Sequence, residues 1–230
     1  MSDTRAFFSV VEKGDVLGVI SYVKKNALLI NSRDDMRGLP PHDKGNTPLM
    51  IAAWRGHLNV AAYLLAQGAA VNEHGYRGRT ALMYAANYCH SDLIQLLLKR
   101  GANVNATEID GTTALMEVVK ESNYFGSEKA LNCIKQLINR GAKLVMQDSD
   151  GNTVLTYAKK CPLEEIRQFF CKYASSVILE EKSIANKKGQ SVSASVSIAP
   201  YATKFQSSSR ILSAVNMKED VPQKISFTKT

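Results

Sequence analysis

Two histidines are spaced so that they could do chemistry together. His57 and His90 lie 33 positions apart in the sequence, and histidine is a common metal ligand in proteins. Zinc sites use three or four protein ligands, however, and no third ligand shares this spacing. The alternative is that each histidine has the same structural role in a repeated unit. We expect that structural role rather than a metal site.

The four cysteines show no spacing typical of a metal or redox motif. None forms a CxxC pair, and Cys161 and Cys171 are too far apart for a zinc knuckle. The segment from Met1 to Arg5 lacks the basic start and apolar core of a secretory signal peptide. No run approaches the roughly 18 apolar residues of a membrane-spanning helix. Scattered cysteines without a signal peptide indicate reduced thiols, so we expect a cytoplasmic protein.

Motifs of the common catalytic families do not occur in this sequence. We find no P-loop, no GxSxG, no HExxH, and no Cys and His at a recognisable family spacing. The serines at 207–209 indicate flexibility rather than a nucleophile. We therefore expect no enzyme, no cofactor and no small-molecule substrate.

The elements that position these side chains repeat along the chain. Thr47, Thr80 and Thr113 follow one another at intervals of 33 positions, and each lies in a Gly-x-Thr-x-Leu segment. A second segment, Gly-Ala-x-Val-Asn, recurs at Gly68 and Gly101. A unit of this length cannot bury its apolar face alone and must stack on a neighbour. The spacing predicts an all-α solenoid of helix-turn-helix units with projecting turns.

Local signals place two helices in each unit. Thr47 can cap a helix, and Pro48 suits the first helical position. Gly56 ends this helix before His57, and Gly68 can adopt the left-handed conformation after the second helix. The segment from 71 to 78 then forms an extended turn that projects away from the helices.

These motifs resemble the ankyrin repeat, with its Thr-Pro-Leu-His-like helix start, its Gly-His between the helices and its Gly-Ala-x-Val-Asn end. The resemblance covers about residues 6–172 and is strongest over 43–106. It implies about four to five repeats, including degenerate end caps, and it implies that the two histidines stabilise the turns between helices. We expect a divergent N-terminal capping repeat with an enlarged finger turn at 1–42, repeats at 43–75, 76–108 and 109–147, a degenerate C-terminal cap at 148–172, and a polar, flexible tail at 173–230.

The third repeat is longer than the two before it. Gly141 follows Gly101 by 40 positions, where the regular interval is 33, so about seven are inserted between the helices, around 121–127. Tyr124 and Phe125 lie in this insertion. They either form an exposed functional loop or pack against a helix.

The resemblance also implies where a partner binds. In this family a protein is held by the finger turns and by the concave face that the first helices line, at positions that do not maintain the stack. Trp, Tyr and Arg at such positions are the residue types most enriched in binding hot spots. The alternative for Trp54 is that it only packs over a neighbouring helix. The family's variable positions give these candidate partner-binding residues: Trp54, Arg55, Tyr76, Arg77, Arg79, Asn87, Tyr88, Ile109, Asp110, Lys120 and Glu121.

Two asparagines invite a second interpretation. Asn72 and Asn105 are similar to the turn asparagines that oxygen-dependent hydroxylases modify in animal ankyrin proteins. The alternative, which we favour, is that they hydrogen-bond the turn backbone.

Charge and the tail leave alternatives open for the function. The net charge of +8 is spread along the whole chain, which favours a solvated basic surface over a nucleic-acid site. Our leading hypothesis is a non-enzymatic, monomeric adaptor that binds a protein partner. One alternative is a secreted bacterial effector, whose repeats target a host protein and whose tail directs translocation into the host cell. A second alternative is a nucleic-acid-associated regulator.

Overall fold

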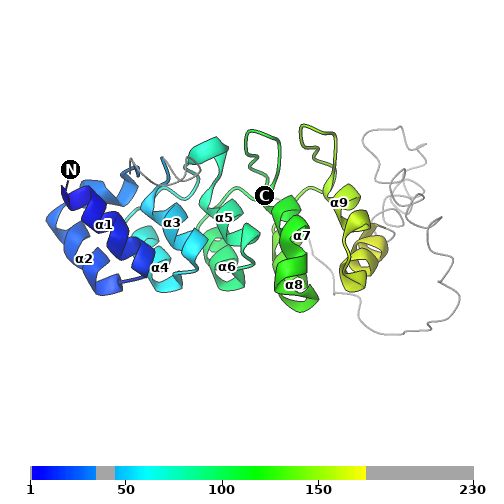
Figure 1. The fold of residues 1–230 in the computed structure, drawn as a ribbon, viewed down its shortest axis with the longest axis horizontal. Helices are drawn as coiled ribbons and strands as arrows, with labels where there is room; N and C mark the ends of the chain where they lie inside the picture. The colour runs from blue at the N-terminus through cyan, green and yellow to red at the C-terminus, as the bar shows by residue number, and fades with distance from the viewer. Residues whose placement is uncertain (1, 35–44, 175–230) are drawn as a thin grey trace, which may run out of the picture.

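The chain forms a stack of helix pairs joined by short turns (Figure 1). The structure is a computed structural model that describes residues 2–34 and 45–174. Within these ranges the elements are helices and turns, without a strand. The bounds are α1 Ser2–Lys13, α2 Val16–Lys25, η1 Ala27–Asn31, α3 Pro48–Arg55, α4 Leu58–Ala66, η3 Tyr76–Gly78, α5 Ala81–Asn87, α6 Ser91–Lys99, α7 Ala114–Phe125, α8 Ser127–Asn139 and α9 Val154–Lys160. Residues 164–174 are also helical.

The helices form two layers. The first helices of the repeats contact one another in chain order, from α1 through α3, α5 and α7 to α9. The second helices, α2, α4, α6 and α8, contact one another in the same order. The turns that follow the second helices project to one side of the stack (Figure 1). The prediction of an all-α solenoid is confirmed.

Threonine starts four of the first helices in the same way. The side chains of Thr47, Thr80 and Thr113 each accept a hydrogen bond from the backbone N–H three residues later, at 3.3, 3.4 and 3.3 Å. Thr153 does the same at 3.4 Å and starts α9. Each cap satisfies one of the N–H groups that a helix leaves free at its first turn.

One continuous apolar core runs through the stack. Leu49, Leu82, Leu115 and Leu155 occupy one repeat position, and each is 1% exposed. A second such column, Leu64, Leu97 and Leu137, is fully buried. Since each leucine is covered by the neighbouring repeats, every repeat depends on the next for its burial.

The inserted segment of the third repeat is helical and does not form a loop. Helix α7 continues to Phe125 and α8 begins at Ser127, so Gly126 alone separates them. Both helices are longer than their counterparts in the preceding repeat, with 12 and 13 residues against 7 and 9. Of the two alternatives for this segment, an exposed loop does not form; Phe125 packs against the core, while Tyr124 is 79% exposed. The added residues lengthen α7 and α8, so their backbone N–H and C=O groups form helical hydrogen bonds and no separate loop is needed.

Two sequence predictions lie partly or wholly outside the described residues. Of the enlarged first finger turn, only residues 32–34 are described. Their end is joined to the next repeat, because Asp34 N donates to Asn46 O at 2.9 Å and Gly45 N donates to Asp34 O at 2.6 Å. The tail beyond residue 174, including the translocation signal that it would carry, lies outside the described part of the chain.

Candidate functional site

Successive finger turns are joined by single backbone hydrogen bonds. Ile109 N donates to Arg77 O at 2.8 Å, and Ser149 N donates to Asp110 O at 2.8 Å. Each bond fixes one finger against the next. The candidate residues on the fingers therefore lie on a shared, ordered edge of the solenoid.

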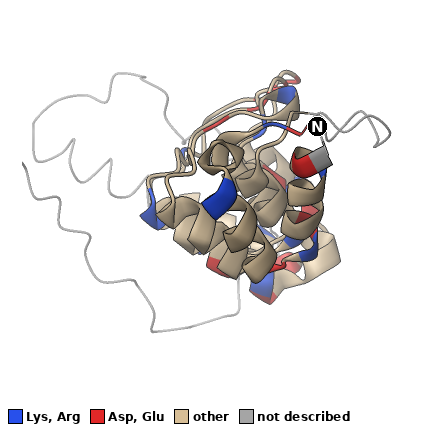
Figure 2. Ribbon diagram, turned by 90° about the vertical axis from the view of Figure 1, so that its left-hand side faces the viewer, with Lys and Arg blue, Asp and Glu red and all other residues tan. Residues whose placement is uncertain are grey.

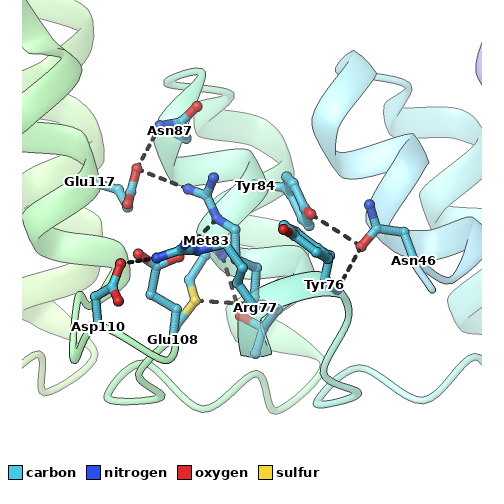
Figure 3. A network of polar contacts seen from close by, with 11 residues as sticks. Asn46, Tyr76, Arg77, Met83, Tyr84, Asn87, Glu108, Asp110 and Glu117 are labelled. Atoms are coloured by element: carbon cyan, nitrogen blue, oxygen red, sulfur yellow. Dashed lines mark hydrogen bonds and ion pairs between the residues drawn. The ribbon is translucent and has the colours of Figure 1, made fainter. Parts of the chain in front are cut away.

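A neutral hydrogen-bond cluster lies between the first two regular repeats. The Tyr84 hydroxyl donates to Asn46 Oδ1 at 3.1 Å, and Tyr76 N donates to the same oxygen at 3.3 Å (Figure 3). Gly75 is required beside it, because a Cβ there would lie 2.2 Å from Asn46 Oδ1. Tyr76 is thereby positioned by its backbone in the finger turn.

An ionic cluster takes the equivalent place between the second and third repeats. Arg79 Nη2 lies 2.9 Å from Glu117 Oε2, and Arg79 Nε lies 3.4 Å from Glu108 Oε2. Asn87 Nδ2 donates to Glu117 Oε2 at 2.5 Å (Figure 3). The guanidinium also lies over the Tyr84 ring, 5.1 Å from its centroid. Arg79 and Asn87 are thus held in place by two carboxylates.

Burial perturbs the carboxylate of Glu108. Its side chain is 10% exposed and that of Glu117 is 7% exposed. Burial raises the pKa of Glu108 above its ordinary value, and Glu117 adds to this effect, while Arg79 opposes it. The arginine is therefore what allows two acidic groups to share this half-buried space.

Arg77 is exposed at the tip of its finger and adopts an unusual backbone conformation. Its φ of 56° lies in the left-handed region, which costs a residue with a Cβ about 1 kcal/mol or more. Its guanidinium forms an ion pair with Asp110 on the next finger. Both side chains remain almost half exposed, at 44% and 46%, so a partner could compete for either charge.

Trp54 and Arg55 form a stacked pair at the end of α3. The Arg55 guanidinium lies 4.3 Å from the centroid of the Trp54 ring and forms an ion pair with Glu12 on α1. Trp54 is half-buried and packs against the core. Trp54 therefore covers its neighbours and leaves part of its surface to solvent, and its role in partner binding stays a prediction.

Aromatic rings gather at the same edge one repeat further along. Tyr88, at the C-cap of α5, stacks on His90 with centroids 6.0 Å apart. It also meets Phe125 edge-on at 6.4 Å. Tyr88 is 38% exposed and Tyr124 is 79% exposed, whereas Phe125 packs against the core. The longer α7 thus adds one half-buried and one exposed ring to this edge.

The two histidines link adjacent repeats. His57 Nε2 lies 2.8 Å from Glu12 O, and His90 Nε2 lies 3.2 Å from Trp54 O. Each ring thereby pairs with a carbonyl at the end of the first helix of the preceding repeat. Burial lowers the pKa of His90, so the neutral ring is favoured. Among the described residues no group of three or more side chains could hold a metal.

Asn72 and Asn105 also bridge repeats. Asn72 Nδ2 donates to Gly101 O at 3.0 Å, and its Oδ1 accepts from Asn103 N at 2.7 Å. Asn105 makes the same pair of bonds one repeat later, to Gly141 O at 3.0 Å and from Lys143 N at 2.8 Å. Both side chains therefore hydrogen-bond turn backbone, as expected, although the turn belongs to the following repeat.

A further acidic position lies at the last finger. The Tyr157 hydroxyl donates to Asp148 Oδ2, and Asn152 N donates to Asp148 Oδ1 at 2.8 Å. Burial alone would raise the pKa of Asp148, but these hydrogen bonds outweigh it and lower the pKa. Lys120, which is exposed, lies 5.4 Å from the centroid of the Tyr157 ring.

The predicted site residues are divided between exposed and half-buried positions. Five are exposed: Arg55, Arg77, Tyr88, Ile109 and Lys120. The remaining six are half-buried: Trp54, Tyr76, Arg79, Asn87, Asp110 and Glu121. Ile109 is the most exposed apolar residue among them, with 75% of its surface exposed.

Sequence reasoning missed Glu108 and Glu117, which hold Arg79 and Asn87. One signal was available, because Glu117 is the single charged residue of the run Ala114–Val119. A charge in an otherwise apolar helical run usually has a buried partner.

Charged residues are otherwise dispersed. Viewed from the N-terminal end of the stack, Lys and Arg lie on several sides of the ribbon, interspersed with Asp and Glu (Figure 2). This distribution fits a solvated surface better than a phosphate-binding track. No helix in the described part of the chain is long and apolar enough to cross a membrane.

Comparison with known families finds a match over part of the repeats. The family model for ankyrin repeats, which comprises three copies, matches residues 23–108. No curated protein matches the chain.

Proposed function

Because this chain carries ankyrin repeats, a protein–protein interaction module, we propose that it is a non-enzymatic adaptor that binds a protein partner through its finger turns and the concave face. The binding surface comprises the eleven candidate residues from Trp54 to Glu121. The observation that carries this proposal is the exposure of apolar and aromatic groups at both ends of the first helices of an ordered scaffold, with Ile109 on a finger turn and Tyr88 at the C-cap of α5. Ile109 is 75% exposed and Tyr88 is 38% exposed, and large apolar groups at such positions are typical anchors of an interface.

The charges among the candidate residues support a partner of mixed charge. Arg55 and Arg77 present cations, while Asp110 presents a carboxylate, and all three are already in exposed or half-exposed ion pairs. Exposed pairs of this kind contribute only about 0–1 kcal/mol to folding. A partner can therefore replace one member of a pair at little cost to the stability of the fold.

The test uses matched substitutions at apolar residues of the surface. Proteins captured from a lysate of the source cells are identified, and the affinity of one purified partner is measured by calorimetry. We expect Ile109→Ser and Trp54→Ala each to weaken binding about tenfold or more, since interface anchors are worth about 1.4 kcal/mol or more. Leu17→Ser is the control, because Leu17 on α2 is 78% exposed and lies outside the proposed surface.

Two outcomes would contradict the proposal. Equal affinity of wild type, Ile109→Ser and Trp54→Ala for the same partner would show that the proposed residues do not form the binding surface. A dissociation constant that rises steeply with salt, with nucleic acid as the captured species, would favour the nucleic-acid alternative.

A further inference from the structure

One position of the first helices changes its chemistry along the stack. It lies seven residues after the capping threonine of each helix. In successive repeats this position is Trp54, Asn87, Lys120 and Lys160. Trp54 stacks on Arg55, and Asn87 donates to Glu117. The column therefore begins with a ring and an amide that already have partners, and it ends with two ammonium groups.

Lys120 is held towards α9 by an anchored ring. Its ammonium group lies 5.4 Å from the centroid of the Tyr157 ring. The Tyr157 hydroxyl donates to Asp148, which fixes the ring within the last repeat. Lys160 follows Tyr157 by three residues and therefore lies on the same side of α9. Both ammonium groups thus lie beside one ring, where α7 and α9 contact each other (Figure 1).

These two cations differ from the arginines of the earlier repeats, which are already paired. Arg55, Arg77 and Arg79 each form an ion pair with a carboxylate. Within residues 2–34 and 45–174, neither Lys120 nor Lys160 forms an ion pair. Both side chains are exposed, so their charge is open to a binding partner.

Helix electrostatics explain only one of the two positions. Lys159 and Lys160 end α9, where the helix dipole favours a cation. Lys120 lies in the middle of α7, more than a turn from its end, so the dipole does not account for it. The acid one turn earlier, Glu117, pairs with Arg79 and is buried. Neither cause within the fold therefore explains Lys120.

An exposed aromatic ring accompanies the cations. Tyr124 follows Lys120 by four residues, so it lies on the same face of α7, and it is 79% exposed. The acid next to Lys120 in the sequence, Glu121, is half-buried and pairs with no cation in the described part of the chain. We call Lys120, Tyr124, Tyr157 and Lys160 the lysine surface.

We propose that the lysine surface binds an acidic segment of a protein partner, in which carboxylates lie next to a large apolar side chain. This proposal rests on the adaptor function proposed above and adds the chemistry of the partner. The carboxylates meet Lys120 and Lys160, and the apolar side chain packs on Tyr124.

The finger turns of the same two repeats carry the opposite charge. Asp110 and Asp150 lie on these turns, and Asp150 is exposed. The acidic segment is therefore directed to the ends of the first helices and away from the fingers. A nucleic-acid strand fits this arrangement less well, because its backbone is negatively charged along its whole length.

The test measures how the full chain binds a fluorescein-labelled peptide of glutamates with one central leucine, by fluorescence anisotropy. The matched peptide has glutamine in place of glutamate. We expect Lys120→Gln/Lys160→Gln to weaken binding of the glutamate peptide about tenfold, which two exposed ion pairs can account for. The control is Lys99→Gln/Lys135→Gln, which removes the same charge from exposed positions on α6 and α8. It should change the affinity less than about twofold.

Charge reversal separates direct contact from net charge. Lys120→Glu/Lys160→Glu should lose the glutamate peptide and bind the same peptide with lysine in place of glutamate, with circular dichroism confirming the fold. The proposal is overturned if the control variant loses as much affinity as Lys120→Gln/Lys160→Gln, or if the glutamine peptide binds as tightly as the glutamate peptide. It is also overturned if a single-stranded oligonucleotide binds more tightly than the glutamate peptide and depends on the same lysines.

The partner captured in the adaptor experiment distinguishes the two proposals. If its binding is weakened in Ile109→Ser and Trp54→Ala but not in Lys120→Gln/Lys160→Gln, the adaptor stands and the acidic segment is overturned. If no protein is captured while the glutamate peptide depends on Lys120 and Lys160, the adaptor proposal fails and the selectivity of the lysine surface for acidic segments stands.

Discussion

The α3–α5 and α5–α7 interfaces use the same repeat positions with different chemistry. At the first interface, Asn46 and Tyr84 form a neutral hydrogen bond of 3.1 Å. At the second, the residues one repeat later are Arg79 and Glu117, which form an ion pair of 2.9 Å. The positions that meet at the interface are thus the same along the stack, whereas the polar side chains at these positions differ.

A third position follows the same rule. Gly75, Glu108 and Asp148 occupy equivalent places at the bases of successive fingers. Gly75 leaves room for Asn46, Glu108 faces Arg79, and Asp148 accepts hydrogen bonds from the last finger and from Tyr157. The comparison teaches that each buried charge in these positions has a partner, a cation in the ionic cluster and hydrogen-bond donors at Asp148.

The largest effect is expected where the ionic cluster loses its cation. Arg79→Ala leaves Glu108 and Glu117 buried without a counter-charge, and we expect the free energy of unfolding to fall by about 3 kcal/mol. Urea unfolding followed by circular dichroism measures it. Arg77→Ala is the control, because its ion pair is exposed and should contribute at most about 1 kcal/mol. Equal losses for the two variants would show that burial does not distinguish them.

A smaller difference is expected between two turns at the same repeat position. Gly56→Ala adds a Cβ at a φ of 80° and within 2.7 Å of the His90 ring, so we expect a loss of about 2 kcal/mol. Cys89→Gly relieves the left-handed backbone but removes a buried side chain, and we expect a net change below about 1 kcal/mol. Thermal or urea unfolding of the reduced proteins measures both changes in the free energy of unfolding. An unchanged free energy of unfolding for Gly56→Ala would mean that the His90 ring moves aside freely.

The smallest effect concerns pH, and it has opposite signs at the two acidic finger positions. Burial raises the folded-state pKa of Glu108 above its ordinary 4.5, so the folded chain binds more protons there and its stability falls as the pH rises through this range. Hydrogen bonds lower the folded-state pKa of Asp148 below its ordinary 3.8, so its stabilising effect is lost as the pH falls through the folded value.

Amide variants test this difference through unfolding measured between pH 3 and pH 7, a range chosen because it spans both ordinary carboxyl pKa values. Glu108→Gln should gain stability relative to wild type as the pH rises above 4.5. Asp148→Asn should be less stable than wild type by about 1 kcal/mol near pH 7 and should approach it in acid. If the stability of both variants relative to wild type changed with pH in the same direction, the opposite pKa shifts of Glu108 and Asp148 would be contradicted.

The stack was predictable from sequence because its signals are local. Threonine caps, turn glycines and leucine columns recur at a fixed spacing, and each is readable from a few neighbouring residues. The histidine prediction also held, since two rings at the same position of successive repeats have equivalent surroundings. These features depend on the repeat itself and not on which residue fills a variable position.

The polar clusters were not predictable in the same way. Arg79 and Glu117 belong to different repeats, and their pairing depends on how far two side chains reach across an interface. The helical form of the insertion was missed because Gly126 marks a break without fixing whether a turn or a loop surrounds it. The eleven partner-binding residues remain a prediction that the proposed substitutions test.

The contact between each turn glycine and the following histidine gives the repeats a fixed order. A repeat that carries a histidine in its turn can follow only a repeat whose turn has no Cβ at the glycine position. The repeat whose turn carries Cys89 cannot precede such a repeat, so these units could not be shuffled or duplicated freely. In an engineered array built from this chain, the segment containing Cys89 would serve as the adapter between modules of two different lengths.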